Sequence, residues 1–192
     1  MIQTPCIIFA GGKSSRMGED KALLPFGGEL TLLQYQYKRL KHIFQTVYIS
    51  CKSSAIYEFD ADFIEDEKQY ETYAPSIGFI SIFNHLHVNE IFVLSVDTPF
   101  VSESEIQALF IHKNSGYDAI IAADNDTIHP LCGIYTKKLL SAFEIMIQNN
   151  NHKLSKLLHE SNTLFVNFHD SSNFLNLNHP SEYQEALLRL NQ

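Results

Sequence analysis

Short apolar runs alternate along this chain with segments of helical periodicity. The runs occupy residues 6–10, 46–50, 62–65, 91–96, 118–123, 131–135 and 163–168. Their length and their β-branched and aromatic content are typical of strands. Most of them are continuously apolar, which predicts strands that are covered on both faces of a sheet.

The segments between the runs carry helix signals. Residues 32–44 place leucine and aromatic side chains at helical spacing, and Thr31 with Gln34 forms a predicted capping box. Residues 103–112 repeat this pattern, with Ser102 and Glu105 as the box. Because strand and helix alternate, we predict an α/β fold with three layers and a doubly wound, mostly parallel sheet.

The chain length predicts a single domain. The 192 residues suffice for one sizeable core, and neither an internal repeat nor a long linker interrupts them. The most polar stretch, residues 148–153, is expected to be a surface loop, with substrate contacts as the alternative.

Charge narrows the classes of partner. A formal charge of −8 argues against general binding to nucleic acid or to an anionic membrane, because both require a basic face. The charge is uneven, however: residues 1–50 carry a balance of +3, and the other residues carry −11. Lys13, Arg16 and Lys21 supply part of the N-terminal surplus. This distribution predicts a local anion site on an acidic protein.

Cysteine usage and hydropathy indicate a cytoplasmic protein. Cys6, Cys51 and Cys132 are odd in number and lack CxxC spacing, so we expect buried free thiols instead of disulfides or zinc ligands. The longest apolar runs fall far below the roughly 18 residues that a membrane span requires. The N-terminus also lacks the pattern of a secretory signal.

The first predicted strand ends in a glycine-rich loop, "FAGGKSSRMGEDK", residues 9–21. Its spacing fits neither GxGxxG nor GxxxxGK[ST], which disfavours a dinucleotide fingerprint and a P-loop. Gly11 and Gly12 leave room for a phosphate beside the backbone, and Arg16 and Lys21 add two cations within ten residues. These features favour a polyphosphate site over the alternative, a solvated glycine-rich turn.

A carboxylate ends the most apolar strand. Asp97 lies in "SVDTPF", residues 95–100, where Pro99 forces Thr98 into an extended conformation. In the common strand order 3-2-1-4-5, strands one and four are neighbours, so Asp97 should face the Gly11–Gly12 loop. A hard carboxylate beside a triphosphate suits Mg²⁺. The alternative is that Asp97 merely caps the helix at 103–112.

Three motifs together, "FAGGKSSRMGEDK", "SVDTPF" and "NLNHP", resemble the molybdenum cofactor guanylyltransferases in order and spacing from residue 6 to about residue 185. The resemblance implies a Rossmann-like nucleotidyltransferase fold. It also implies transfer of GMP from Mg-GTP to the terminal phosphate of molybdopterin that carries molybdenum, which releases pyrophosphate. Molybdoenzyme apoproteins or their chaperones are the protein partners it suggests.

The resemblance also assigns residues to the nucleotide half of the site. It implies that Arg16 and Lys21 bind the phosphates and that Asp97 holds Mg²⁺. The family's guanine and ribose contacts match Asp66 and the loop at 74–78, which ends in Gly78. The remaining nucleotide contacts that it implies are Phe9, Ala10, Gly11 and Gly12. Two positions depart from the family pattern: Ala74 replaces a usual glycine, and Ser50 replaces a common asparagine.

The C-terminal half is expected to bind the molybdopterin. His129, Asn176 and Asn178 match the family's contacts to the pterin phosphate, and Asn178 could instead approach the metal. His129 could also be an ordinary loop histidine, and Asn178 could cap the last helix.

The reaction implied is an in-line attack by a phosphate oxygen on the α-phosphorus of GTP, for which the protein supplies no nucleophile. Two alternatives stay open. One is a sister nucleotidyltransferase that uses CTP or a sugar phosphate, and the other is a non-catalytic nucleotide- or cofactor-binding chaperone.

Overall fold

The computed structural model describes residues 1–11, 20–67, 69, 74–125 and 127–190. The strands occupy the positions that the apolar runs predict. They are β1 (Cys6–Phe9), β2 (Val47–Cys51), β3 (Asp62–Glu65), β4 (Glu90–Ser95), β5 (Ala119–Asp124), β6 (Thr127–Thr136) and β7 (Thr163–Phe168).

The helices fill the segments between the strands. The α-helices are α1 (Leu32–Lys41), α2 (Pro75–Leu86), α3 (Glu103–Phe110), α4 (Leu140–Gln148), α5 (Leu154–Glu160) and α6 (Pro180–Leu190). Four short 3₁₀ helices lie among the described residues: η1 (Lys21–Leu23), η2 (Ser54–Ile56), η3 (Lys137–Leu139) and η4 (Ser171–Phe174).

All seven strands form one sheet in the order β3-β2-β1-β4-β6-β5-β7. Strands β3, β2, β1 and β4 are mutually parallel, and β7 is parallel to β5. Strand β6 is antiparallel to both of its neighbours, β4 and β5. The sheet is therefore mixed but mostly parallel, as the alternation of strands and helices predicts.

The expected order 3-2-1-4-5 is correct for its first four strands and wrong for the fifth. β6 follows β5 after a short connection and pairs antiparallel with both β5 and β4, so it lies between them. Asn125 begins this connection at a φ of 45°, a left-handed conformation that asparagine tolerates.

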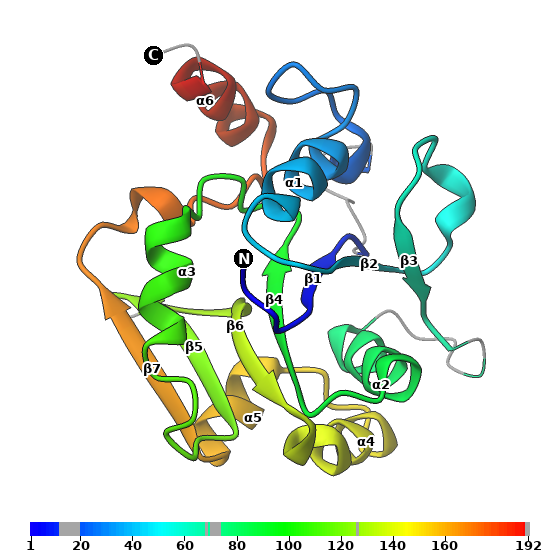
Figure 1. Ribbon diagram of the computed structural model, residues 1–192, viewed down its shortest axis with the longest axis vertical. Coiled ribbons are helices and arrows are strands. Elements are labelled where there is room, and N and C mark those ends of the chain that lie inside the picture. The colour runs from blue at the N-terminus through cyan, green and yellow to red at the C-terminus, as the bar shows by residue number, and fades with distance from the viewer. Residues whose placement is uncertain (12–19, 68, 70–73, 126, 191–192) are drawn as a thin grey trace.

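Helices cover both faces of the sheet, which gives three layers (Figure 1). Alternate residues of β1 point to opposite sides: Cys6 and Ile8 pack in one core, and Ile7 and Phe9 pack in the other. The first core contains residues of α1, α3 and α6, and the second contains residues of α2, α4 and α5. Burial on both faces explains why the central strands β1, β4 and β5 are almost continuously apolar.

Helix boundaries agree with the sequence prediction at their N-termini. Thr31 caps α1 by accepting the Gln34 N–H, and Ser102 with Glu105 forms a complete capping box on α3. Helix α1 ends at Lys41, three residues before the predicted end. Phe44, which follows it, stacks on Phe92 of the sheet with ring centroids 5.1 Å apart.

All three cysteines are buried free thiols, as predicted. Burial raises the pKa of Cys6, and it raises the pKa of Cys51 and of Cys132 to about 12, so the thiols stay protonated at neutral pH. Over the described part of the chain, no helix combines the length and the hydropathy needed to cross a bilayer.

The backbones of β5 and β6 approach closely at Gly133, which leaves no room for a side chain there. A Cβ atom at this position would lie 2.4 Å from the carbonyl oxygen of Ile120 and 3.0 Å from the Cα of Ile121. The irregular pairing of β5 and β6 between Ile121 and Ala123 begins beside it. We expect Gly133→Ala to lower the free energy of unfolding by about 1–3 kcal/mol, because neither backbone has room to move away.

Urea unfolding of the purified variant measures this loss. Gly11→Ala is the matched control, because a Cβ atom there meets nothing within 4 Å. Equal unfolding midpoints for the two variants would contradict the packing role of Gly133.

Candidate functional site

The C-terminal edge of β1 and β4 brings two predicted motifs together. The strands are parallel neighbours, and Phe9 pairs with Ser95. Gly11 therefore leaves the sheet beside the turn that carries Asp97, and the predicted adjacency of the two motifs is confirmed for the described residues. Gly12 and Arg16, the other predicted phosphate contacts of this loop, lie outside the described residues.

Asp97 lies in a tight turn, with its carboxylate toward the glycine-rich loop. The Ser95 hydroxyl donates to Asp97 Oδ1 at 2.6 Å, and the Thr98 N–H and hydroxyl both donate to the Ser95 carbonyl. The α3 helix is capped by Ser102 instead, so the structure excludes the alternative that Asp97 serves as its cap.

Lys21, the last residue of the glycine-rich loop, hydrogen-bonds two other residues of the predicted site, the carboxylate of Asp97 and the amide of Asn178. It begins η1, where Asp20 caps the first turn by accepting the Ala22 N–H. Lys21 Nζ donates to Asp97 Oδ2 at 3.2 Å and to Asn178 Oδ1 at 2.7 Å. The Lys21 and Asp97 side chains are 15% and 18% exposed, so the pair is partly desolvated yet open to a ligand.

Asn178 lies on the segment that enters α6. The neighbouring Leu177 N–H donates to the Asp97 carbonyl at 2.9 Å, which ties this segment to the Asp97 turn. Glu182 accepts the N–H groups of Asn178 and His179. The Glu182 carboxylate thus accepts the backbone N–H groups that precede α6. The Asn178 side-chain oxygen accepts from Lys21 instead of capping that helix.

Phe9 and Ala10 present only backbone to this edge. Phe9 is 5% exposed and packs against Phe79, with ring centroids 5.0 Å apart. Ala10 is 4% exposed, and its carbonyl accepts the Tyr57 hydroxyl. Side-chain contact between a nucleotide and either residue is therefore restricted.

Asp66 follows β3 at the same sheet edge, and its N–H donates to the Cys51 carbonyl at 2.9 Å. Partial burial raises the pKa of the Asp66 carboxyl from 3.8 to about 6, an effect that Lys52 only partly offsets.

Ala74 and Gly78 occupy the first turns of α2. Ala74 is the N-cap residue, with an extended backbone (φ −149°, ψ 138°) that any residue adopts, so an alanine in place of glycine causes no strain. A Cβ atom at Gly78 would lie 2.7 Å from the Phe9 ring and 3.0 Å from Ser50 Oγ. Gly78, beside the small Ser50, therefore lets α2 pack closely on the sheet.

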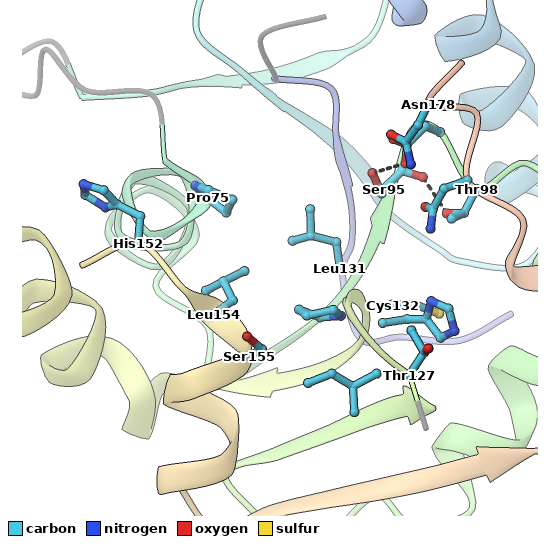
Figure 2. A pocket seen from close by; sticks show the side chains of 15 residues that line it. Pro75, Ser95, Thr98, Thr127, Leu131, Cys132, His152, Leu154, Ser155 and Asn178 are labelled. Atoms are coloured by element: carbon cyan, nitrogen blue, oxygen red, sulfur yellow. Dashed lines mark hydrogen bonds between the residues drawn. The ribbon is translucent and has the colours of Figure 1, made fainter. Parts of the chain in front are cut away.

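A cavity of about 420 Å³ adjoins the Asp97 turn. Figure 2 shows Ser95, Thr98 and Asn178 at one end of it, Pro75, His152 and Leu154 at the other, and Leu131 between them. All three residues predicted to bind molybdopterin, His129, Asn176 and Asn178, line this cavity. The structure therefore brings them together with Asp97.

His129 lies on β6 instead of on a loop. Its ring stacks on Phe174, with centroids 4.6 Å apart and planes inclined by 16°. Its Nε2 atom lies 3.1 Å from Asp124 Oδ1 but outside hydrogen-bond geometry. This nitrogen is buried beside the Asp124 carboxylate, so the ring is held by Asp124 on one side and by Phe174 on its face.

His152 and Ser95 are cavity residues that the sequence prediction did not single out. His152 lies in the polar stretch at 148–153, for which substrate contact was the alternative to a plain surface loop. Its Nε2 contacts Asn150 Oδ1 at 3.0 Å, and its Nδ1 is buried without a partner. The signal for Ser95 was its place two residues before Asp97.

One end of the cavity combines a positive charge with oxygen donors. A lysine, a carboxylate and an amide oxygen converge there. Among the described residues, no group of three or more His, Cys, Asp or Glu side chains could hold a metal alone. A divalent cation at Asp97 would therefore draw further oxygen ligands from a substrate phosphate and from water.

Comparisons with known proteins place this arrangement in a family. Residues 6–164 match the model of the MobA-like NTP transferase domain. The chain is 37% identical over 180 residues to a molybdenum cofactor guanylyltransferase from Campylobacter jejuni, a match that covers 94% of this chain and 93% of that protein.

Solved structures show the same fold. The molybdopterin-guanine dinucleotide biosynthesis protein A of Archaeoglobus fulgidus superposes with a TM-score of 0.82 at 21% identity, covering 98% of this chain and 99% of that one. The 2-C-methyl-D-erythritol 4-phosphate cytidylyltransferase of Thermus thermophilus gives 0.70 at 16% identity, with 100% of both chains covered. These likenesses establish the nucleotidyltransferase fold, and the sequence match is more specific: the chain belongs to the molybdenum cofactor guanylyltransferases, within the family of MobA-like NTP transferase domains.

Proposed function

We propose that this protein transfers GMP from Mg-GTP to molybdenum-loaded molybdopterin and releases pyrophosphate, forming molybdopterin guanine dinucleotide. The observation that carries the proposal is the convergence of Lys21, Asp97 and Asn178 at one end of the cavity, in a chain of this family. These residues come from the motif expected to bind the nucleotide, the motif expected to bind Mg²⁺ and the motif expected to bind the acceptor.

The nucleotide occupies the N-terminal half of a single domain that spans residues 1–192. Gly11 and Gly12 admit the phosphates beside the backbone, and Arg16 and Lys21 neutralise their charge. Phe9 and Ala10 contribute backbone groups. Asp66 and the start of α2, up to Gly78, receive the guanine and ribose. The extended backbone of Ala74 supports this assignment, because it permits alanine where the family usually has glycine.

Mg²⁺ fits the residues at the Asp97 turn. Asp97 offers a carboxylate and Asn178 an amide oxygen, both hard donors of the type that Mg²⁺ prefers, and the scarcity of other protein ligands suits an ion that is shared with substrate phosphates. When bound, the ion would supply charge neutralisation on the triphosphate. The Ser95 hydroxyl orients the Asp97 carboxylate for this role.

The chemical step needs positioning and charge, without a protein nucleophile. An oxygen of the molybdopterin phosphate forms a bond to the α-phosphorus of GTP, and the bond from that phosphorus to the pyrophosphate oxygen breaks. Lys21 and Arg16 stabilise the negative charge that grows on the pyrophosphate. In the free protein Lys21 donates to Asp97 and Asn178, so binding of the triphosphate redistributes the donors of one ammonium group.

The acceptor lies in the cavity beside this centre, in the C-terminal half of the chain. Asn176 and Asn178 bind its phosphate, and His129, which lines the same cavity, contributes a further contact. The protein acts in the cytoplasm on small-molecule substrates, and molybdoenzyme apoproteins or their chaperones receive the product.

A nucleotide titration tests the proposed function. With molybdenum-loaded molybdopterin and Mg²⁺ present, we expect pyrophosphate release with GTP and little with CTP, ATP or UTP. Equal turnover with CTP would favour a sister nucleotidyltransferase. Nucleotide binding without any pyrophosphate release would favour a cofactor-binding chaperone.

Removal of either charged group at the centre should abolish transfer without unfolding the protein. We expect Lys21→Ala and Asp97→Asn to lower kcat by on the order of 10²-fold or more, because each group stabilises charge that develops during the reaction. Lys38→Ala is the matched control, since Lys38 pairs with Glu29 away from the cavity and its side chain is 56% exposed. Wild-type turnover in Lys21→Ala or Asp97→Asn would contradict these roles.

The raised pKa of Asp66 predicts pH-dependent GTP binding. Guanine presents N–H donors, so it should bind the carboxylate form, which is complete above a pKa of about 6 and lost as the pH falls through it. At one pH unit below that pKa, we expect GTP to bind about tenfold more weakly than at neutral pH.

Calorimetric titration of GTP at several pH values measures this change. Asp66→Asn should bind GTP more weakly at neutral pH and should lose most of the pH dependence. An unchanged pH profile in that variant would show that Asp66 does not bind the base.

A further inference from the structure

We propose that Gln36 and Arg39 of α1 are positioning residues that hold the Asp97 turn from behind, and so set the place of the Asp97 carboxylate. Neither residue belongs to a motif that the family resemblance assigns. The inference rests on the proposed role of Asp97 in binding Mg²⁺, but it concerns the backbone that carries this carboxylate.

Gln36 is a polar residue on the buried face of α1. It is 0% exposed, as are Leu32, Leu33 and Leu40 of the same helix. Burying an amide among leucines costs free energy unless its donors and acceptor are all bonded. A leucine would fill this core position at lower cost, so the amide calls for a role beyond packing.

The Gln36 amide bonds the turn that carries Asp97. Its two Nε2–H donors are shared among three backbone carbonyl oxygens, those of Ser95 at 3.4 Å, Val96 at 3.3 Å and Thr98 at 3.1 Å. The carbonyl of Asp97 itself accepts the Leu177 N–H at 2.9 Å. Every carbonyl from residue 95 to 98 is therefore bonded, three of them by this one side chain.

Arg39 fixes the orientation of the Gln36 amide. Its Nε and Nη2 donate to Gln36 Oε1 at 3.1 Å and 2.6 Å, and its Nη1 donates to the Val101 carbonyl. A guanidinium only donates, so it must face the amide oxygen, and the amide nitrogen must then face the turn. Arg39 thus braces the turn at residues 95–98 and the chain just beyond it.

The position of Arg39 carries a cost that packing alone does not explain. Burial lowers the pKa of its guanidinium, and its acceptors, an amide oxygen and a carbonyl, are neutral. A partly buried charge that has no carboxylate partner among the described residues is unfavourable for stability. A rigid fork of donors is, however, well suited to hold two oxygens at a fixed separation.

The hold on the turn fixes the position of the Asp97 carboxylate. With the backbone of residues 95–98 held by α1, Asp97 offers its carboxylate to Lys21 and to a bound cation at one place. Groups that orient a metal ligand without touching the metal typically change metal affinity or activity by about 10–100-fold when they are removed.

Gln36→Met tests the proposal, because methionine has nearly the volume of glutamine but lacks the donors. We expect Mn²⁺, the probe for the divalent site, to bind the GTP complex about tenfold more weakly when titrated by electron paramagnetic resonance. Hydrogen exchange of the Thr98 amide, which bonds the Ser95 carbonyl, should also become faster. At saturating Mg²⁺ the KM for GTP should change less than kcat.

Leu40→Ala is the matched control for loss of α1 packing, since Leu40 is equally buried on the same helix. It should lower the melting temperature and leave Mn²⁺ affinity and Thr98 exchange unchanged. Arg39→Lys is the second test variant, and it should give a smaller change than Gln36→Met in the same direction. If Gln36→Met fails to fold, Arg39→Lys decides the question.

Failure of the positioning role and failure of the proposed function give different results. Wild-type exchange and Mn²⁺ affinity in Gln36→Met, or equal effects in Leu40→Ala, would overturn the positioning role. If instead the wild-type protein transfers no GMP, the proposed function fails, and hydrogen exchange at Thr98, which needs neither metal nor turnover, still tests the hold of Gln36 on the turn.

Discussion

The ammonium group of Lys21 is the point on which the site depends. It donates to Asp97 and to Asn178, and so joins the glycine-rich loop, the end of β4 and the approach to α6. A lysine that is only 15% exposed loses much of its hydration, which these two oxygens replace. A triphosphate bound as we propose would compete for the same donors. The ammonium charge that holds Asp97 and Asn178 in place is therefore the one that would bind the substrate. Binding of the triphosphate would weaken the bond between Lys21 and Asp97.

Much of the fold could be predicted because both faces of the sheet are buried. This burial makes most of the strands continuously apolar, so they can be recognised without knowledge of their neighbours. Adjacency of β1 and β4 followed from the usual winding of such sheets. The place of β6 did not follow, because an apolar pattern does not encode which neighbours a strand pairs with or in which direction.

The site also contains residues that the sequence could predict and residues that it could not. Asp97 and Lys21 were predictable, since charged residues that follow an apolar strand or a glycine pair stand out locally. Gln36 was not predictable, because its partners lie far away in the chain. His152 was not singled out, because its local contact with Asn150 does not show that it lines the cavity beside Asp97. Gln36 reaches carbonyls about sixty residues away. The only local signal was the Gln36 amide among the leucines of the buried face of α1. This signal indicates that the amide is hydrogen-bonded, but it does not identify the partner.

The contact between Lys21 and Asn178 spans 157 positions of the chain. Ribosomal synthesis proceeds from the N-terminus, so β1, the glycine-rich loop and β4 emerge long before the segment that carries Asn178. A nascent chain can thus build most of its parallel strands while its lysine and carboxylate still lack their amide partner. Because Asn178 follows every strand in the sequence, we expect the contact between Lys21 and Asn178 to form late in folding, after the sheet that supports it.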